Sequence, residues 1–251
     1  MFPIHDDNPT LRTPVVTFVL IALNAVVWAS LQGFGAPDRL FHSLCGFALI
    51  PGELLGTVEP GTRLQLAEGH ACVLRGGLTG RAWMTPLSSM FMHGGWLHLL
   101  GNMWFLWVFG NNVEDSMGRG RFIVFYLLCG LGAAAAQVAS NPASAVPMVG
   151  ASGAIGGVMG AYAVLHPRAH VHMLLWFGFY VRTVVVPAAF MLGYWFVIQL
   201  VMGLPRFGEE GGGVAFWAHA GGFVAGMGLV LIFRNPTLLA LQRRTIAGGA
   251  G

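Results

Sequence analysis

The chain has 251 residues, of which 55% are hydrophobic and only 9% are charged, whereas an ordinary soluble domain carries roughly a quarter charged residues. This composition excludes collagen-like, disordered and disulfide-scaffold chains, and it favours a helical membrane protein in which the 37 glycines allow close helix packing. The formal net charge of +3 comes from scattered arginines without a basic run, so we expect no nucleic-acid partner.

Six segments free of Asp, Glu, Lys and Arg are candidates to cross the apolar core of a bilayer, which takes about 20 residues. In chain order they are residues 15–31, 97–109 with flanking residues, 122–139, 149–165, 184–204 and 214–233. The third and fourth are separated at Ser140–Ser144, where proline and small polar residues favour a turn. The piece from Met173 to Tyr180 is too short to cross, and we expect it at the membrane interface. Since every Asp and Glu lies outside these spans, we predict an all-α polytopic membrane protein with six transmembrane helices.

The arginines of the short loops predict the orientation of the chain. With the N-terminus inside, only Arg206 lies in a short external loop. The internal arginines are Arg12, Arg119, Arg121, Arg168, Arg234, Arg243 and Arg244. We therefore predict a cytoplasmic segment at 1–13, a membrane domain at 14–235 and a cytoplasmic tail at 236–251. Because the first residues hold Asp6 and Asp7 in place of a basic region, the first span does not resemble a cleaved signal peptide.

The predicted external loop at 34–89 is long for a loop without structure of its own, so we expect a functional or partly membrane-embedded element there. Cys45 and Cys72 both lie in this loop, which faces an oxidising side in the predicted topology. Either a disulfide or two buried thiols fits this placement. Cys129 lies within a span, where a packing role is expected.

Four polar side chains stand out because polar groups inside the membrane are functional candidates. His98 and Asn102 are four residues apart in the second span and share a helix face, Ser152 begins the fourth span, and His219 lies early in the sixth. The second, fourth and sixth spans run in the same direction, so all four groups lie at a similar depth. We expect them to converge on one site.

Small residues accompany the serine and the histidine. Ser152 shares a helix face with Gly156 and Gly160, and His219 shares one with Gly222 and Gly226. Such spacing lets two helix backbones approach closely enough for a hydroxyl and an imidazole to form a hydrogen bond.

The chemistry that these groups predict is nucleophilic acyl transfer. Neutral His219 would accept the proton of Ser152 during attack on a carbonyl and return it to the leaving amine. Asn102, His98 and the backbone N–H of Ser152 would stabilise the oxyanion. No carboxylate lies within a span, so we predict a Ser-His dyad without a third member.

Three motifs in this order resemble the rhomboid family of intramembrane serine proteases. They are HGGWLH at 93–98 followed by Asn102, GASG at 150–153, and AHAGG at 218–222 continuing to Gly226. Residues 114–118 also resemble the loop that follows the second helix in that family. Each motif is weak alone, but the ordered set is specific and covers roughly residues 88–233.

The resemblance implies a rhomboid-like six-helix core in a bacterial inner membrane, with its active site open to the external side. It implies Ser152 as nucleophile, His219 as base, and His98 and Asn102 as oxyanion donors, with Gly150, Gly153, Gly222 and Gly226 as the glycines of the motifs. It also implies transmembrane protein substrates in the lipid bilayer, and neither a metal nor another cofactor.

The resemblance further suggests a lateral entrance for the substrate near the second and fifth helices. The aromatic residues 194–196 could then form part of a gate, and the glycines at 211–213 could let the preceding loop act as a cap. The alternative is that residues 194–196 are ordinary lipid-facing aromatics and that the glycines at 211–213 form an ordinary turn.

The sequence departs from the family at two places. Many relatives carry a Trp-Arg pair in the external loop where this chain has Met84-Thr85, with Trp83 displaced by one position. Relatives also often place an aromatic residue four positions after the serine, stacked on the histidine, where this chain has Gly156. His219 is therefore expected to be held differently.

The sequence also bears on alternative functions and sites. A catalytically silent rhomboid-like protein that binds transmembrane helices generally lacks the serine or the histidine, and this chain has both. Ion-coupled transporters commonly place carboxylates in their spans, which this chain does not. His93 is expected to be structural. His166, His170 and His172 could suggest a metal site, but Pro167 interrupts any common helix face and no carboxylate or cysteine accompanies them, so a solvated turn is favoured.

Overall fold

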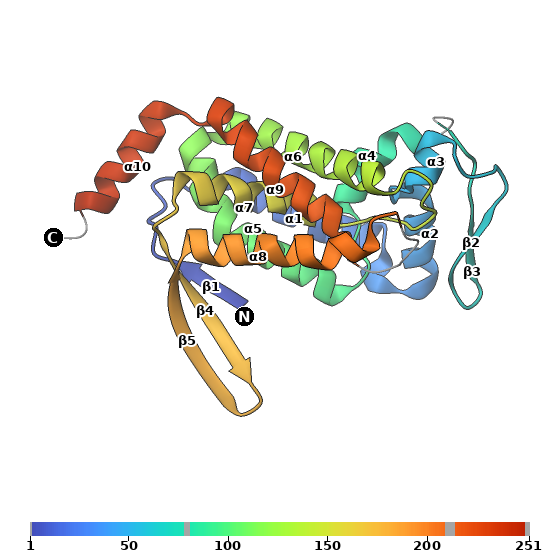
Figure 1. The fold of residues 1–251 in the computed structure, drawn as a ribbon, viewed down its shortest axis with the longest axis horizontal. Coiled ribbons are helices and arrows are strands. Elements are labelled where there is room, and N and C mark those ends of the chain that lie inside the picture. The colour runs from blue at the N-terminus through green and yellow to red at the C-terminus, as the bar shows by residue number, and fades with distance from the viewer. Residues whose placement is uncertain (1, 78–80, 209–213, 249–251) are drawn as a thin grey trace.

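A computed structural model describes residues 2–77, 81–208 and 214–248, most of which are helical (Figure 1). The helices are α1 (Val15–Ser30), α2 (Pro37–Phe47), α3 (Pro51–Leu55), α4 (Thr85–Ser88), α5 (Trp96–Met117), α6 (Arg119–Ser140), α7 (Ser152–Leu165), α8 (Ala188–Gly203), α9 (Phe216–Phe233) and α10 (Pro236–Gly248). The strands are β1 (Phe2–Asp6), β2 (Arg63–Ala67), β3 (His70–Val73), β4 (His170–Phe177) and β5 (Tyr180–Pro187).

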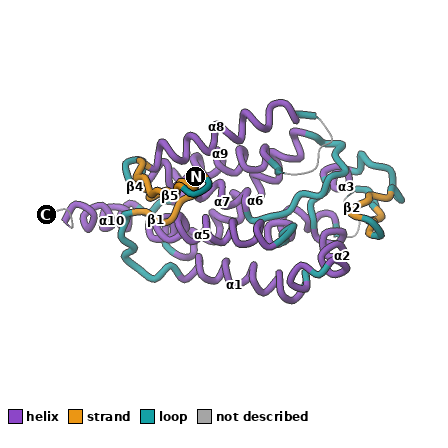
Figure 2. The backbone as a smooth tube through the Cα atoms, turned by 90° about the horizontal axis from the view of Figure 1, so that it is seen from below, coloured by secondary structure: helices purple, strands orange, loops and turns teal. Residues whose placement is uncertain are grey.

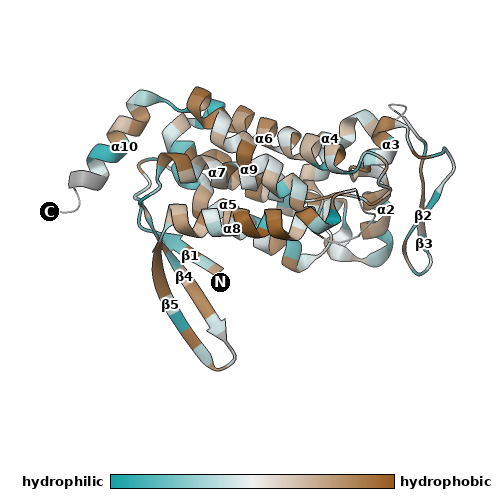
Figure 3. Cartoon of the chain, viewed as in Figure 1, coloured by the Kyte–Doolittle hydropathy of each residue, from teal (hydrophilic) through white to brown (hydrophobic). Residues whose placement is uncertain are grey.

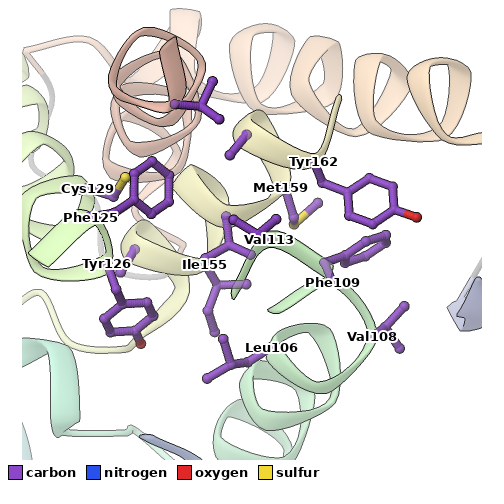
Figure 4. Packing of buried hydrophobic residues seen from close by; sticks show 14 of the residues in the cluster. Leu106, Val108, Phe109, Val113, Phe125, Tyr126, Cys129, Ile155, Met159 and Tyr162 are labelled. Atoms are coloured by element: carbon purple, nitrogen blue, oxygen red, sulfur yellow. The ribbon is translucent and has the colours of Figure 1, made fainter. Parts of the chain in front are cut away.

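Helices α1 and α5–α9 form a bundle around α7 (Figure 2). Every residue from Gly153 to Tyr162 in α7 is buried, and this helix packs mainly against α9, α6 and α5. Figure 4 shows the core at this contact, where Ile155 and Met159 of α7 meet Leu106 and Phe109 of α5. The serine that begins α7 is thus carried by the most enclosed helix of the bundle.

Three helical stretches of the described chain are long and apolar enough to cross a membrane: Arg119–Ser140, Ala188–Arg206 and Phe216–Phe233. The helices Val15–Ser30 and Ser152–Leu165 are apolar but shorter. Large apolar side chains on the outer faces, such as Val26 of α1 and Ile232 of α9, are 60% and 75% exposed, and apolar colour covers much of the bundle in Figure 3. Such an apolar surface is suited to contact with lipid. That all six predicted helices cross the membrane stays a prediction.

The second predicted span is longer than expected, because α5 continues through Glu114 and Asp115. The expectation that residues 114–118 form a loop is wrong for 114–117, which belong to the last turn of this helix. Both carboxylates satisfy backbone donors near the start of α1: Glu114 accepts from the N–H groups of Val16 and Thr17 at 3.1 and 2.8 Å, and Asp115 accepts from Leu11 at 2.6 Å. A carboxylate at a helix N-terminus also complements the helix dipole.

The described chain is mostly helical, as predicted, but it also contains two small sheets that the prediction of an all-α protein did not include. One has the order β1-β4-β5 and the other pairs β2 with β3, all antiparallel. The piece from Met173 to Tyr180 belongs to the β4–β5 hairpin, which turns at Gly178 with a φ of 59°. Since residues 184–187 belong to β5, the fifth helix begins at Ala188 and not at Val184.

The predicted external loop has structure of its own, as expected from its length. It contains α2, α3, the β2–β3 hairpin and α4, and Cys45 and Cys72 form a disulfide with their Cα atoms 5.3 Å apart. Backbone hydrogen bonds join Leu49 to Met148 in both directions, at 3.0 and 2.7 Å. The loop therefore packs against the segment that leads into α7.

The C-terminal residues that were predicted as a tail form α10 over their described part. Gln242 of this helix is buried and accepts a hydrogen bond from the hydroxyl of Ser116 at 2.8 Å. This contact ties α10 to the end of α5.

Candidate active site

The structure brings the predicted serine and histidine together. Ser152 is the first residue of α7 and His219 lies in the first turn of α9, and the distance from Ser152 Oγ to His219 Nε2 is 2.7 Å. A hydroxyl at this distance can donate its proton to a neutral imidazole nitrogen.

Glycines make this approach possible. A Cβ atom on Gly222 would lie 2.0 Å from the carbonyl oxygen of Gly153, and one on Gly226 would lie 2.0 Å from that of Gly157. Real Cβ atoms do not approach so closely, so α7 and α9 touch backbone to backbone over two turns. Gly156 and Gly160, which were predicted on the serine's face, also abut α9, with backbone oxygens of His219 and Phe223 at 3.0 and 2.2 Å from the positions of a Cβ.

A third side chain, which the sequence reasoning missed, holds the histidine. Gln199 of α8 is buried, and its Oε1 lies 2.9 Å from His219 Nδ1. The Gln199 amide nitrogen donates to the carbonyl of Trp195 at 3.3 Å, which orients Oε1 as the acceptor. Nδ1 then carries the imidazole proton and Nε2 presents its lone pair to Ser152. Gln199 is a polar residue inside a predicted span, and that signal could have identified it.

Trp195 of α8 also faces the histidine. The ring centroids of Trp195 and His219 are 5.8 Å apart with an interplanar angle of 33°. A Cβ on Gly156 would lie 3.7 Å from the Trp195 ring, so the indole occupies space beside this glycine. His219 is thus held from α8, by Gln199 and Trp195.

His98 points its Nε2 toward the segment that precedes Ser152. Its Nδ1 accepts a hydrogen bond from the backbone N–H of Gly94 at 3.3 Å, which leaves the proton of a neutral ring on Nε2. Gly150 has a φ of 123°, and a Cβ there would come within 2.7 Å of His98 Nε2. Glycine is therefore required for this donor to approach the serine.

Asn102 lies one turn further along α5. Its side-chain nitrogen donates to the carbonyl of His98 at 2.7 Å. An amide nitrogen has two protons, so the second remains for another acceptor. Asn102 lines a cavity together with Ser152 and His219.

Two cavities meet at the serine. The outer cavity has a volume of about 550 Å³ and extends from Ser152 and His219 to Arg206 near the loops. A side cavity of about 210 Å³ lies between α5 and α8, where Phe105 and Trp195 line it. The predicted gate residue Trp195 therefore borders the side cavity, whereas the glycines at 211–213 that were predicted to serve a cap lie outside the described residues.

Of the other histidines, His93 lies beside the site, with its ring centroid 5.2 Å from that of His98. His93 is buried, and its backbone N–H and carbonyl pair with the amide of Gln32 at 2.9 and 2.8 Å. His166 is buried, so the expectation of a solvated turn is wrong for it; its Nε2 lies 3.3 Å from Ser116 Oγ. Burial lowers the pKa of His166 to about 4. His170 and His172 lie on β4, where His172 contacts Asp7.

These features describe an integral helical membrane protein with a serine–histidine pair between two of its helices. A family model described as the Rhomboid domain matches residues 80–236, which is more than half of the chain. The chain therefore belongs to the rhomboid family.

Curated relatives carry the same family name. YdcA of Bacillus subtilis, whose name places it with the rhomboid proteases, is 31% identical over 149 residues, which cover 59% of this chain and 61% of that protein. Rhomboid protease GluP of Bacillus subtilis is 40% identical over 88 residues, or 34% of this chain and 17% of that protein. RHOMBOID-like protein 5 of Arabidopsis thaliana is 30% identical over 158 residues, covering 62% and 46%. The chain thus spans less than two thirds of the length of these relatives.

Proposed function

We propose that this protein is an intramembrane serine endopeptidase that cleaves transmembrane or membrane-proximal segments of other membrane proteins. The observation that carries the proposal is the 2.7 Å contact between Ser152 Oγ and His219 Nε2, with the opposite ring nitrogen held by Gln199 at 2.9 Å. A serine is a weak nucleophile unless a base accepts its proton, and an oriented neutral imidazole supplies that base.

The reaction follows from this arrangement. Ser152 Oγ attacks the carbonyl carbon of a peptide bond while its proton passes to His219 Nε2, and the carbonyl becomes an oxyanion. The tetrahedral intermediate collapses, the C–N bond breaks, and His219 donates the proton to the leaving amine. Water then attacks the acyl-enzyme, His219 accepts its proton, and the acid product leaves as Ser152 regains a proton.

Neutral hydrogen-bond donors near Ser152 would stabilise the oxyanion. In this proposal the donors are His98 Nε2–H, the second N–H of Asn102 and the backbone N–H of Ser152. His98 and Asn102 line the side cavity together with Ser152, and helix N-termini have unpaired N–H groups. Such preorganised donors stabilise developing negative charge.

The two cavities suggest separate routes for the reactants. The side cavity between α5 and α8 suits a transmembrane segment that enters from the lipid, with residues 194–196 as part of a gate. The outer cavity connects the serine to the loop end and suits water. In this proposal both termini are cytoplasmic, the membrane domain comprises 14–235 in a bacterial inner membrane, and the reaction needs no cofactor.

The proposal is tested by mass spectrometry after treatment of the detergent-purified protein with a fluorophosphonate. We expect a stoichiometric adduct on Ser152 that is absent in Ser152→Ala and in His219→Ala. Ser152→Ala replaces a hydroxyl by hydrogen and keeps the fold, which thermal unfolding verifies. It should also reduce cleavage of a model transmembrane substrate in proteoliposomes by at least roughly 1000-fold.

The rival function is a silent rhomboid-like protein that binds transmembrane helices. A folded wild-type sample without adduct or cleavage would favour it. Equal cleavage by wild type and Ser152→Ala would exclude the dyad.

A further inference from the structure

Four side chains of types that can ligate a metal ion share one face of the β1–β4 ladder. This ladder lies at the end of the molecule opposite the β2–β3 hairpin (Figure 1). His5 is paired with His172 across the two strands, and the backbone N–H of Asp7 donates to the carbonyl of His170 at 3.0 Å. Side chains two residues apart in a strand point to the same face. The side chains of His5 and Asp7 therefore lie on the same face of the ladder as those of His170 and His172.

The distances between these side chains are short. His172 Nε2 lies 2.8 Å from one oxygen of Asp7, and His170 Nδ1 lies 3.7 Å from the other. The rings of His5 and His172 are stacked with centroids 4.1 Å apart. One donor atom each from His5, Asp7 and His172 lies within 4.8 Å of the other two.

The opposite face of the ladder fixes the strands to the bundle. Val171 is buried, and Asp6 accepts hydrogen bonds from the Tyr162 hydroxyl and from the Asn112 amide, the latter at 2.8 Å. Because this inner face is anchored, the outer donors are held in register on two strands that are about 165 residues apart in the sequence.

We propose that His5, Asp7 and His172 bind a divalent transition-metal ion of the zinc class, with His170 or water as the fourth ligand. Imidazole and carboxylate are preferred ligands of Zn²⁺, at about 2.0–2.2 Å. A tetrahedral ion with such bonds needs its donors roughly 3.4 Å apart. The three donors are already near that spacing, and the exposed side chains of His5 and Asp7 can rotate to reach it.

The expectation that no carboxylate accompanies His170 and His172 is wrong, because the fold brings Asp7 to 2.8 Å from His172. A bound ion would join β1 to the hairpin that leads into α8. It would stabilise this junction and take no part in the chemistry at Ser152, so the site is independent of the proposed function.

The inference is tested with the full chain in detergent after removal of any affinity tag and treatment with chelator. Calorimetric titration with Zn²⁺ should give one equivalent per chain. Asp7→Asn and His172→Ala should each weaken binding by at least about 10-fold, since even loss of a residue that only orients a ligand does so in known sites. His42→Ala, which removes an exposed histidine of α2, is the matched control and should bind as the wild type does.

Co²⁺ gives a second readout that reports geometry. Visible absorption bands typical of four-coordinate Co²⁺ should form with the wild type and disappear in both ligand variants. Thermal unfolding of the metal-free samples shows whether a variant has lost its fold, and His5→Ala provides a further variant on the other strand. Absence of stoichiometric Zn²⁺ binding by the wild type, or equal affinity in the triple variant His5→Ala, Asp7→Asn, His172→Ala, would overturn the inference.

Discussion

In the proposed mechanism, Gln199 takes the position that the third group of a catalytic triad has in serine proteases, although it is neutral. A carboxylate in that position both orients the histidine and stabilises the imidazolium that forms during attack. The amide oxygen of Gln199 can perform the first task at 2.9 Å from Nδ1, and it avoids placing an unpaired charge inside an apolar helix. We infer that Gln199 is a positioning residue for His219.

Replacement of Gln199 by leucine should slow the reaction without weakening substrate binding. Without the acceptor, His219 can adopt the tautomer or rotamer that turns its lone pair away from Ser152. We expect kcat and the rate of fluorophosphonate labelling to fall by roughly 10- to 100-fold, which is part of the 10²- to 10⁴-fold that a positioned general base contributes, with KM changed little. Gln199→Glu restores an acceptor for Nδ1–H and should recover part of the rate. A merely structural role would instead lower thermal stability in Gln199→Leu and leave the labelling rate of the folded fraction unchanged.

Asn102→Ala tests the oxyanion donor. Loss of one such hydrogen bond should reduce kcat by roughly 10- to 1000-fold. Labelling of Ser152 should persist, because the dyad itself is intact. Cleavage of a model transmembrane substrate by the variant and by the wild type, compared under saturating substrate, provides the measurement. An unchanged kcat would assign the oxyanion to His98 and the backbone alone.

The sequence allowed the residues of the site to be predicted only where a motif marked them. Ser152, His219, His98 and Asn102 stand in short patterns with helical spacing, so their convergence could be predicted. Gln199 stands alone among apolar neighbours, and its role depends on how α8 is rotated toward α9. No local pattern encodes that rotation.

Among the elements, the contact between α7 and α9 depends on glycine most strongly. The small-residue spacing predicted a close approach, and the structure shows backbone against backbone at Gly153 and Gly222. The hairpin β4–β5 was not predicted, because a short apolar run has no periodicity that separates a strand from a buried helix. Likewise, the extension of α5 through Glu114 depends on a tertiary partner, the start of α1, which local sequence cannot reveal.

Gly222→Ala should separate the two helices. The new methyl group would lie 2.0 Å from the Gly153 oxygen, so α9 must shift and the contact between Ser152 and His219 must lengthen. We expect a loss of stability of about 1–3 kcal/mol and at least roughly a 10-fold loss of Ser152 labelling. Gly228→Ala on the same helix is the control, because a Cβ there has nothing within 4 Å. Equal labelling in the two variants would contradict the packing argument.

At the scale of the whole molecule, the two ends of the bundle are built differently. The loop end contains a disulfide and the outer cavity, and the opposite end contains the three-stranded sheet and the ion pair between Arg12 and Asp115 at 3.4 Å. The serine–histidine pair lies between α7 and α9, and the glycines of that contact belong to neither the loop nor the three-stranded sheet. A change that destabilises the loop should therefore leave the reactivity of Ser152 largely unchanged.

The disulfide offers the test of this separation. Cys45 and Cys72 are 27 residues apart. A cross-link of that span lowers the entropy of the unfolded chain and thereby raises the free energy of unfolding by about 3–4 kcal/mol. In the double variant Cys45→Ser, Cys72→Ser, the loop should therefore unfold at a lower temperature than in the wild type. Residues 34–77 should then become sensitive to protease. Labelling of Ser152 should remain within roughly 3-fold of the wild type, because the hydrogen-bonded pair and its glycine contacts lie outside the loop.

Thiol counting shows whether the bond forms. The denatured wild type should react with one maleimide per chain, at Cys129, and with three after reduction. A reducing agent should make the loop of the wild type sensitive to protease, and it should not change the protease sensitivity of the double variant. If removal of the disulfide abolished labelling while α7 and α9 stayed folded, the loop would be part of the catalytic arrangement through the Leu49–Met148 pairing, and the independence of the dyad from the loop would be wrong.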